Sequence, residues 1–153
     1  MPLIDLVAPT AVIPALKVTS KKQVLQELSA KAAKLTGQNE RVIFETLLQR
    51  EKLGSTGVGN GIAIPHGKLG KLERLFGLFA RLDRPVDFEA LDGQPVDLIF
   101  LLLAPEGAGA DHLKALARVA RLLRDPDIAR KLRESRDAEA LFAVLTLHPS
   151  AAA

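Results

Sequence analysis

The sequence predicts a single domain of the α/β class. Val96 to Leu103 is the most hydrophobic run of the chain, and its eight residues between Pro95 and Pro105 fit a central strand buried on both faces better than a helix. Apolar residues recur at helical spacing both before and after this run. With 153 residues and 48% hydrophobic content, the chain suits one substantial core, so we expect no second domain.

The N-terminal segment predicts a strand followed by a helix. Residues 11–18 are apolar and partly β-branched but contain Pro14, which is typical of an edge strand or of a loop entering one. Residues 20–23 have the spacing of a capping box, and Gly37 can end the helix that follows. The predicted core stripe of this helix is Val24, Leu25, Leu28, Ala32 and Leu35.

A second helix is expected between Asn39, which can cap it, and about Leu53, where Gly54 can end it. Arg50 continues the inward-facing stripe of this helix in its last turn, immediately before a glycine-rich segment. A cation in a last turn is also favoured by the helix dipole alone. The functional alternative is that the planar, permanently charged guanidinium of Arg50 faces a bound anion.

The glycine-rich segment spans Leu53 to Lys68 and devotes five of its sixteen residues to glycine. Its glycines allow successive N–H groups to converge on one anion, so we expect an anion-binding nest here. Residues 62–64 form a short apolar run that can enter a sheet, and Pro65 is expected to end its pairing. The following residue, His66, would then be delivered from a stiff strand end beside the nest. The alternative is a glycine-rich turn with an incidental histidine.

Two further strands and their turns are expected after this segment. Residues 75–82 alternate between apolar and other positions and predict a strand. We expect residues 83–85, Asp-Arg-Pro, to turn the chain, and residues 86–88 to form a short strand. Asp92-Gly93 is typical of a tight turn before the central strand.

A helix is expected from His112 to about Arg124, after a flexible link at residues 106–110 and a cap at Asp111. Its predicted core stripe is Leu113, Leu116, Ala117, Ala120 and Leu123. A neighbouring stripe carries Lys114, Arg118 and Arg121, which we interpret as a solvated face. His112 lies at the helix start beyond a buried strand, a position where α/β proteins bind anions, although an ordinary exposed histidine fits equally well.

The chain is expected to end with two short helices. Asp125-Pro126 predicts a cap and first position for a helix reaching about Arg133. Residues 137–147 predict a final helix that buries Leu141, Val144 and Leu145. We interpret His148 as a surface residue at the helix end and expect residues 149–153 to be disordered.

Composition excludes several classes of function. The chain has no cysteine, which removes disulfides, thiolate catalysis and cysteine-based zinc sites and favours the reducing cytoplasm. It has neither a signal-peptide pattern nor an apolar run near the ~20 residues that span a bilayer, so we expect no membrane insertion. The net charge of +3 and the lack of Trp and Tyr give little support for nucleic-acid binding. The three histidines have no metal-ligand spacing, and no metal or cofactor is expected.

The remaining combination of candidate groups suits phosphoryl transfer. A neutral imidazole can attack phosphorus in line, while His66's second ring nitrogen needs an acceptor that fixes the tautomer. Arg50, the loop amides and His112 would stabilise the charge on the peripheral oxygens.

The segment from 53 to 68, Leu-Gly-Ser-Thr-Gly-Val-Gly-Asn-Gly-Ile-Ala-Ile-Pro-His-Gly-Lys, resembles the phosphorylation-site signature of the mannitol/fructose-type enzyme IIA family. This family belongs to the bacterial phosphoenolpyruvate:sugar phosphotransferase system, and the resemblance is greatest to its nitrogen-regulatory, PtsN-like branch. Arg-Glu-Lys-Leu at 50–53, Gln-Pro-Val-Asp-Leu at 94–98 and His112-Leu before a basic helix also resemble the family in order and spacing. The similarity covers about residues 3–147, which we take as the ordered core of one enzyme IIA domain of the second type spanning 1–153.

The resemblance implies a fold, a chemistry and partners. The implied fold is a mixed parallel and antiparallel sheet flanked by helices on both sides. His66 would be the phosphorylated histidine, modified at Nε2 (tele-phosphohistidine), with Arg50 as the active-site arginine and His112 as the second active-site histidine. The donor would be the phosphocarrier HPr or its nitrogen-branch counterpart NPr, charged by an enzyme I that uses phosphoenolpyruvate.

Two functions follow from this resemblance, and a third from the charges. The protein would be a phosphotransferase component that regulates target proteins of nitrogen, potassium or carbon metabolism according to its phosphorylation state. Alternatively, it would pass the phosphoryl group from His66 to the IIB domain of a sugar permease. The third possibility is a nucleic-acid-binding module that uses Lys114, Arg118 and Arg121.

Overall fold

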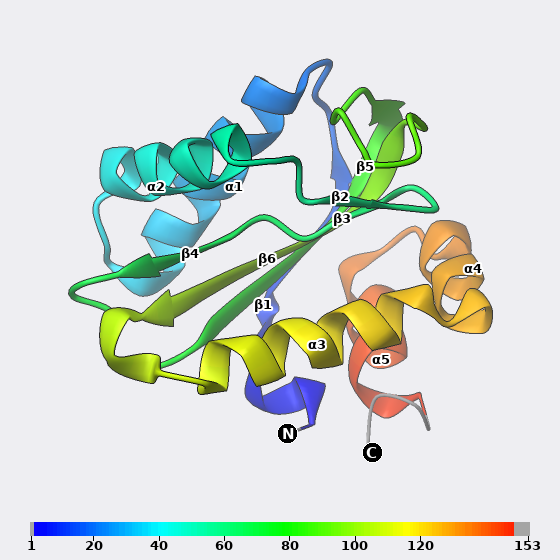
Figure 1. Cartoon of the computed structure of the whole chain (residues 1–153). Coiled ribbons are helices and arrows are strands. Elements are labelled where there is room, and N and C mark those ends of the chain that lie inside the picture. Colours follow the sequence, from blue (N-terminus) through cyan, green and yellow to red (C-terminus); the bar gives the residue numbers. More distant parts are fainter. Residues whose placement is uncertain (1, 149–153) are drawn as a thin grey trace.

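The computed structural model describes residues 2–148 (Figure 1), and the predicted disorder of residues 149–153 lies outside that range. The strands are β1 (Val7–Leu16), β2 (Gly57–Gly59), β3 (Ile62–Ala63), β4 (His66–Leu69), β5 (Phe76–Val86) and β6 (Val96–Pro105). The helices are α1 (Lys21–Thr36), α2 (Glu40–Lys52), α3 (Asp111–Arg124), α4 (Pro126–Glu134) and α5 (Ala138–Leu147). Two short 3-10 helices, η1 (Leu3–Asp5) and η2 (Glu106–Ala108), precede β1 and follow β6.

The sheet is built around β6, in the order β1-β5-β6-β3-β2, with β4 also pairing with β6. β6 runs antiparallel to β5 and parallel to β3 and β4, while β1 is parallel to β5. Side chains of β6 from Leu98 to Leu103 are at most 1% exposed. The predictions of a mixed sheet and of a central strand buried on both faces are therefore confirmed.

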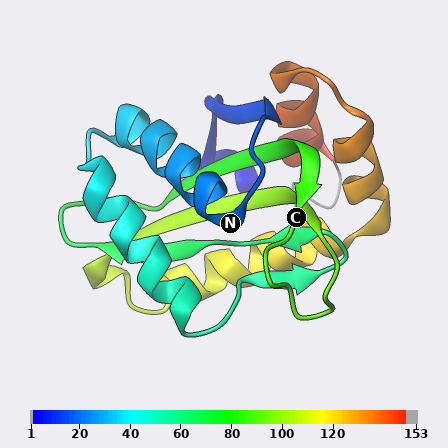
Figure 2. The same cartoon turned by 90° about the horizontal axis from the view of Figure 1, so that it is seen from above.

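Helices cover both faces of the sheet, as predicted. In Figure 1, α1 and α2 lie above the sheet, and α3, α4 and α5 lie below it. Figure 2, viewed from above, shows α1 and α2 crossing the near face. The sheet core includes Phe79 of β5 and Phe100 of β6, both fully buried. The carboxyl end of α2 and the start of α3 lie on opposite sides of the sheet edge formed by β4, and this arrangement creates the site described below (Figure 1).

The predicted helix caps are mostly confirmed. The Ser20 hydroxyl accepts a hydrogen bond from the Gln23 amide at 3.2 Å, and the Asn39 side chain accepts one from the Val42 amide at 3.0 Å. Gly37 ends α1 with a φ of +74°, a conformation that favours glycine. Leu35, predicted to lie in the core, is 36% exposed because it lies in the last turn of α1.

Two strand predictions need correction. β1 is an edge strand as predicted, but it begins at Val7. Residues 83–85 do not turn the chain, because β5 continues through them to Val86, which pairs with Val96 of β6. The register shifts between Arg81 and Val86, so residues 83–85 are an exposed irregularity within one long strand. Residues 86–88 accordingly do not form a separate strand.

The prediction for α3 was wrong in its cap and only partly right in its core stripe. The helix begins at Asp111, and its N-cap is Ala110, which makes no side-chain cap. Leu113 is 59% exposed, whereas the buried residues of α3 are Ala115, Arg118, Val119, Leu122 and Leu123. Of the predicted stripe, Leu123 is fully buried and Leu116 and Ala120 are partly buried against the core. Arg118, expected on a solvated face, is only 6% exposed.

Candidate functional site

The glycine-rich segment folds into a tight β-hairpin rather than into an open loop. β2 and β3 are antiparallel, and Asn60 and Gly61 connect them with φ values of 57° and 78°. Positive φ at both central residues is the geometry of a type I′ turn, for which Asn-Gly is the preferred sequence. β3 then pairs with β6, so the hairpin extends the sheet.

The predicted anion-binding nest was wrong. The amide groups of Thr56, Gly57 and Asn60 donate to the side chains of Glu51, Ser55 and Asp92, respectively, at 3.0 Å in each case. These N–H groups satisfy acceptors of the protein itself, so they do not converge on an external anion. The glycines serve the hairpin geometry instead.

His66 begins a strand instead of following the end of one. Pro65 interrupts the pairing after β3, as predicted, and its carbonyl accepts from the Leu102 amide at 2.9 Å. The ladder resumes at His66, which pairs with Leu102 in parallel register as the first residue of β4. The backbone on both sides of His66 is thus bonded to the central strand, which fixes the position of the ring.

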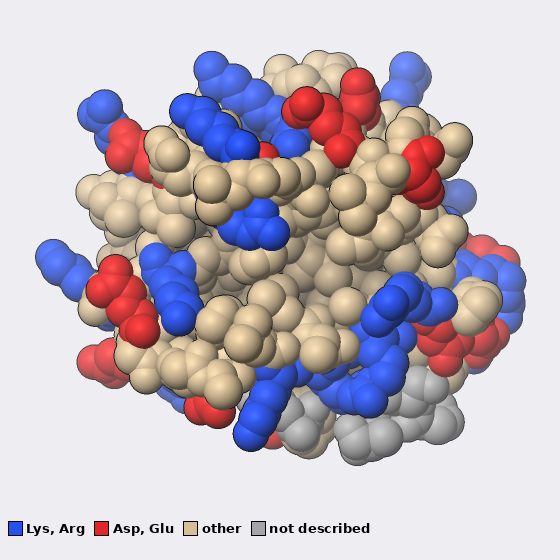
Figure 3. Space-filling model, viewed as in Figure 1, with Lys and Arg blue, Asp and Glu red and all other residues tan. Residues whose placement is uncertain are grey.

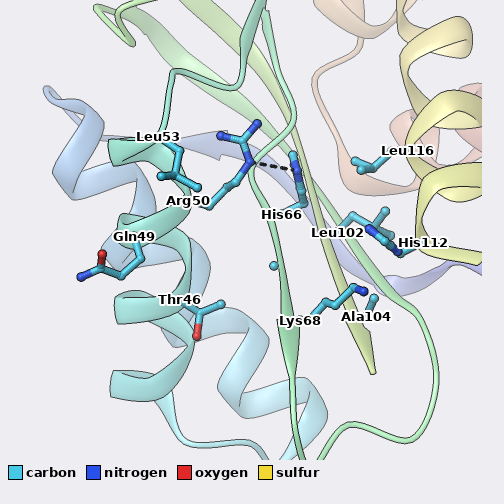
Figure 4. A pocket seen from close by; sticks show the side chains of 11 residues that line it. Thr46, Gln49, Arg50, Leu53, His66, Lys68, Leu102, Ala104, His112 and Leu116 are labelled. Carbon is cyan, nitrogen blue, oxygen red and sulfur yellow. Dashed lines mark hydrogen bonds between the residues drawn. The ribbon is translucent and has the colours of Figure 1, made fainter. Parts of the chain in front are cut away.

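Both ring nitrogens of His66 have defined partners. Nδ1 lies 2.8 Å from the carbonyl oxygen of Ile64, which can only accept, so Nδ1 carries the proton. Nε2 is therefore unprotonated and accepts from Nε of Arg50 at 3.3 Å (Figure 4). Arg50 also donates from Nη1 to the carbonyl of Gly54 at 2.8 Å, which orients its guanidinium group.

The surroundings of His66 favour its neutral form. Burial lowers the pKa of His66 below the ordinary value of 6.5, because the charged imidazolium loses hydration. The hydrogen bond to Ile64 raises the pKa, whereas the nearby charge of Arg50 lowers it further. The net effect is a lowered pKa, so at pH 7 Nε2 presents a lone pair to its surroundings.

His66 lines a hollow of about 460 Å³ between α2, β4, β6 and α3 (Figure 4). The lining residues are Thr46, Gln49, Arg50, Leu53, His66, Gly67, Lys68, Leu102, Ala104, His112 and Leu116. His66, Arg50 and His112, the three site residues expected from the sequence, thus meet in one hollow. Nδ1 of His112 lies 2.8 Å from the carbonyl of Gly109, so its ring is held in the same way as that of His66.

Lys68 also lines the hollow, although it was not among the site residues expected from the sequence. Side chains at alternate positions of a strand share a face, so His66 at the start of β4 predicts Lys68 beside it. Among the residues that line the hollow, none is acidic. The hollow therefore combines a neutral imidazole with cationic groups and suits a bound or covalently attached anion.

Two other expected features lie away from this hollow. His148 is not a simple surface residue, since its Nε2 lies 2.9 Å from Oδ2 of Asp127 and its side chain is 14% exposed. Burial of Arg118 removes the middle of the predicted basic stripe, so Lys114 and Arg121 do not form a continuous surface with it. Within residues 2–148, no helix is both long and apolar enough to cross a membrane.

A fixed, unprotonated histidine nitrogen can act as a nucleophile that carries a transferred group covalently, and an adjacent arginine can balance the charge of an anionic group. The chain matches the model of the family described as phosphoenolpyruvate-dependent sugar phosphotransferase system, EIIA 2, over residues 5–147. It belongs to this family.

Within the family, the chain is most clearly similar to nitrogen regulatory proteins. It is 77% identical to the nitrogen regulatory protein of Bradyrhizobium diazoefficiens over 153 residues, which is the full length of both chains. The crystal structure of the nitrogen regulatory protein IIA-Ntr from Neisseria meningitidis matches with a TM-score of 0.88 and 37% identity, covering 93% of this chain and 97% of that one. The fructose-specific EIIABC component of Bacillus subtilis is 38% identical over 129 residues, which are 84% of this chain but 20% of that protein.

Proposed function

We propose that this protein is a phosphohistidine carrier that accepts a phosphoryl group on Nε2 of His66 from a phosphocarrier protein of the HPr or NPr type. The observation that carries the proposal is the ring geometry of His66. Its Nδ1 proton is committed to the Ile64 carbonyl, and its Nε2 lone pair faces Arg50 in a hollow without acidic lining residues. Membership in a family of phosphotransferase-system components supports the same chemistry.

The transfer needs no base. The lone pair of His66 Nε2 forms the new N–P bond while the N–P bond of the donor's phosphohistidine breaks, and the donor imidazole leaves with that electron pair. His66 keeps its Nδ1 proton throughout, since the Ile64 carbonyl already accepts it. The protein's task is then alignment and stabilisation of the charge on the three peripheral oxygens.

Arg50 and His112 would supply that stabilisation. The Arg50 guanidinium lies against the attacking nitrogen and can shift its N–H groups to phosphoryl oxygens once Nε2 is occupied. His112 lines the same hollow and would donate to an oxygen through Nε2 when protonated, because its Nδ1 is bonded to Gly109. Lys68 would add a positive charge to the same anion.

We favour regulation over sugar uptake as the output. The relative at 77% identity is named a nitrogen regulatory protein and has the same length as this chain. Target proteins of nitrogen, potassium or carbon metabolism would distinguish the phosphorylated from the unphosphorylated form. The alternative is transfer to the IIB domain of a sugar permease. The similarity to a fructose-specific EIIABC component supports this alternative.

The test is intact mass after incubation with enzyme I, the cognate phosphocarrier and phosphoenolpyruvate. Wild type and His148→Ala, whose histidine lies outside the hollow, should both gain one acid-labile phosphoryl group, and His66→Ala should gain none. Labelling of His66→Ala, or no labelling of wild type by a donor shown to be active, would refute the proposal.

The two outputs are separated by a second assay. The phosphorylated protein is mixed with purified sugar-specific IIB domains, and loss of the phosphoryl group from His66 is followed over time. Transfer to a IIB domain as fast as that from its own sugar-specific IIA protein would refute the regulatory proposal and support the uptake function.

A further inference from the structure

Glu51 is a buried carboxylate directly beside Arg50 in the last turn of α2, and it is only 7% exposed. One oxygen accepts from the Thr56 amide at 3.0 Å and lies 3.0 Å from Nζ of Lys21, while the other accepts from the Thr56 hydroxyl. The Lys21 ammonium also lies 4.8 Å from the centre of the Phe88 ring. A carboxylate held by this many donors is fixed in position.

A continuous series of hydrogen bonds leads from Glu51 to Nδ1 of His66. Glu51 holds both the amide and the hydroxyl of Thr56. The Thr56 carbonyl accepts from the Ile64 amide at 3.0 Å, and the Ile64 carbonyl accepts from Nδ1 of His66 at 2.8 Å. The orientation of the carbonyl that sets the tautomer therefore depends on Thr56, and Thr56 depends on Glu51.

A second path leads from Glu51 to Nε2 of the same ring. The backbone carbonyl of Glu51 accepts from the Gly54 amide at 3.1 Å. The Gly54 carbonyl in turn accepts from Nη1 of Arg50, whose Nε donates to Nε2 of His66. Both nitrogens of the imidazole are thus held by groups whose positions are fixed at the carboxyl end of α2.

We propose that Glu51 is a positioning residue for phosphoryl transfer. Through Thr56 and Ile64, it keeps His66 in the tautomer in which Nδ1 is protonated and the lone pair of Nε2 can attack. This role rests on the proposed function of His66. The carboxylate is required because all groups that face its oxygens are donors. An amide at this position presents an NH₂ group to one of these donors, and the mismatch releases Thr56 or Lys21. Partners that orient metal-binding histidines in this indirect way change affinity or activity by about 10- to 100-fold when they are lost, and we expect an effect of that size here.

The experiment compares Glu51→Gln and Thr56→Val with wild type by ¹⁵N NMR of the His66 ring and by single-turnover phosphorylation. In wild type the ring should be the Nδ1–H tautomer, and in both variants the Nε2–H tautomer should become detectable. The maximal transfer rate should fall by about tenfold or more for Glu51→Gln while the donor concentration at half-maximal rate stays unchanged. Thr56→Ser retains both donor groups and should restore the wild-type tautomer and rate.

The matched control is Asp97→Asn, which weakens another tether of the same hairpin. Asp97 pairs with Nε of Arg133 at 2.9 Å, and Nη2 of Arg133 donates to the Asn60 carbonyl at the hairpin turn. This control should lose stability without changing the His66 tautomer. An unchanged tautomer in the Glu51 and Thr56 variants, or an equal change in the control, overturns the positioning role.

The tautomer measurement needs no phosphoryl donor, so it distinguishes the two proposals. A wild-type protein that is never phosphorylated, but whose His66 tautomer responds to Glu51→Gln and not to Asp97→Asn, refutes the carrier function and leaves Glu51 as the residue that orients the ring. A protein that is phosphorylated at the wild-type rate in all variants refutes the positioning role alone.

Discussion

The guanidinium group of Arg50 donates to two acceptors at once, so we expect this position to require arginine. Nε donates to Nε2 of His66, and Nη1 donates to the Gly54 carbonyl. The second bond fixes the plane of the guanidinium group, and the first positions that group against the nucleophilic nitrogen. A lysine ammonium retains the charge but has no fixed fork that reaches both acceptors.

We therefore expect Arg50→Lys to lower the single-turnover rate of His66 phosphorylation by about 10²-fold, the usual effect of losing an oriented donor to developing charge. Arg41→Lys on the same helix is the control, since Arg41 is exposed and pairs with Glu45 of the same helix. A rate for Arg50→Lys within twofold of the control would show that charge alone suffices.

The lowered pKa of His66 also predicts how stability depends on pH. Above the ordinary pKa of 6.5, the ring is neutral in both the folded and the unfolded chain and contributes no dependence. As pH falls below 6.5, the unfolded chain takes up a proton before the folded chain does, so the free energy of unfolding decreases until the folded pKa is passed. Replacement by a residue that does not titrate removes this contribution.

Urea unfolding from pH 7.5 down to pH 4.5 tests this dependence in wild type and His66→Gln. The difference in free energy of unfolding, wild type minus variant, should decrease from pH 7 downward and then level off. A difference that increases as pH falls would mean that folding raises the pKa of His66.

At the scale of elements, the spacing between α2 and β4 depends on the absence of a side chain at residue 67. A Cβ atom added to Gly67 would lie 2.6 Å from Cγ2 of Thr46 and 3.7 Å from its Cβ. Gly67 directly follows His66, so an enforced shift of α2 would also separate Arg50 from the ring.

We expect Gly67→Ala to destabilise the fold by about 1–3 kcal/mol, as overpacked positions do, and to slow phosphorylation. Thr46→Ser removes Cγ2 but keeps the hydroxyl that donates to the Val42 carbonyl, so the double variant should regain most of both losses. Urea unfolding and single-turnover rates of the two single variants and the double variant complete the cycle. Additive losses would mean that Thr46 is not the obstacle.

Elements with local signals could be predicted from the sequence, and elements that depend on packing could not. The caps Ser20, Asn39 and Asp125 were predictable because each satisfies amides within three residues of itself. The exact core stripe of α3 was not predictable, because two overlapping leucine-containing stripes compete and only packing in the whole fold buries Ala115 and Val119 fully. Residues 83–85 resembled a turn, because nothing local reveals that Val86 still pairs with Val96.

The hairpin shows a local signal that was present but not used. Asn60-Gly61 between two short β-forming segments is among the strongest indications of a type I′ turn, and it would have predicted β2 and β3. The interpretation of the glycines as a nest assigned anion binding to backbone amides of this segment. Some of these amides instead donate to side chains such as Glu51 and Asp92.

At the scale of the molecule, the site assembles from three segments that the sequence keeps 16 and 46 residues apart. The pair Arg50 and His66 could be anticipated from the family signature, as could His112. Lys68 required knowing that a strand begins at His66, and Glu51 required knowing which side of α2 faces the hairpin. Both depend on how the strands meet β6, which is information carried by the whole fold.

The face around the hollow is also a property of the whole molecule. Toward its centre the surface in Figure 3 is mostly uncharged, and Lys and Arg side chains gather below it over α3 and α4. The exposed cations of α3 are Lys114, Arg121 and Arg124, and Leu113 is exposed on the same helix. A partner that brings its phosphohistidine to His66 would approach over these charges, so we expect an acidic surface on that partner.

Reversal of the three exposed α3 charges to Glu should therefore slow transfer from the phosphocarrier by about tenfold or more at low salt, because steering increases association rates by 10-fold to 10³-fold. The difference from wild type should shrink as salt shortens the Debye length from about 10 Å at 0.1 M to about 3 Å at 1 M. The control reverses Lys17, Lys22 and Lys34, three exposed lysines outside the elements that line the hollow, and has the same net charge. Quenched reactions at several salt concentrations give the transfer rates of the two triple variants. Equal slowing in the two triple variants would assign the effect to net charge, and faster transfer in the α3 variant would show that the partner's surface is basic.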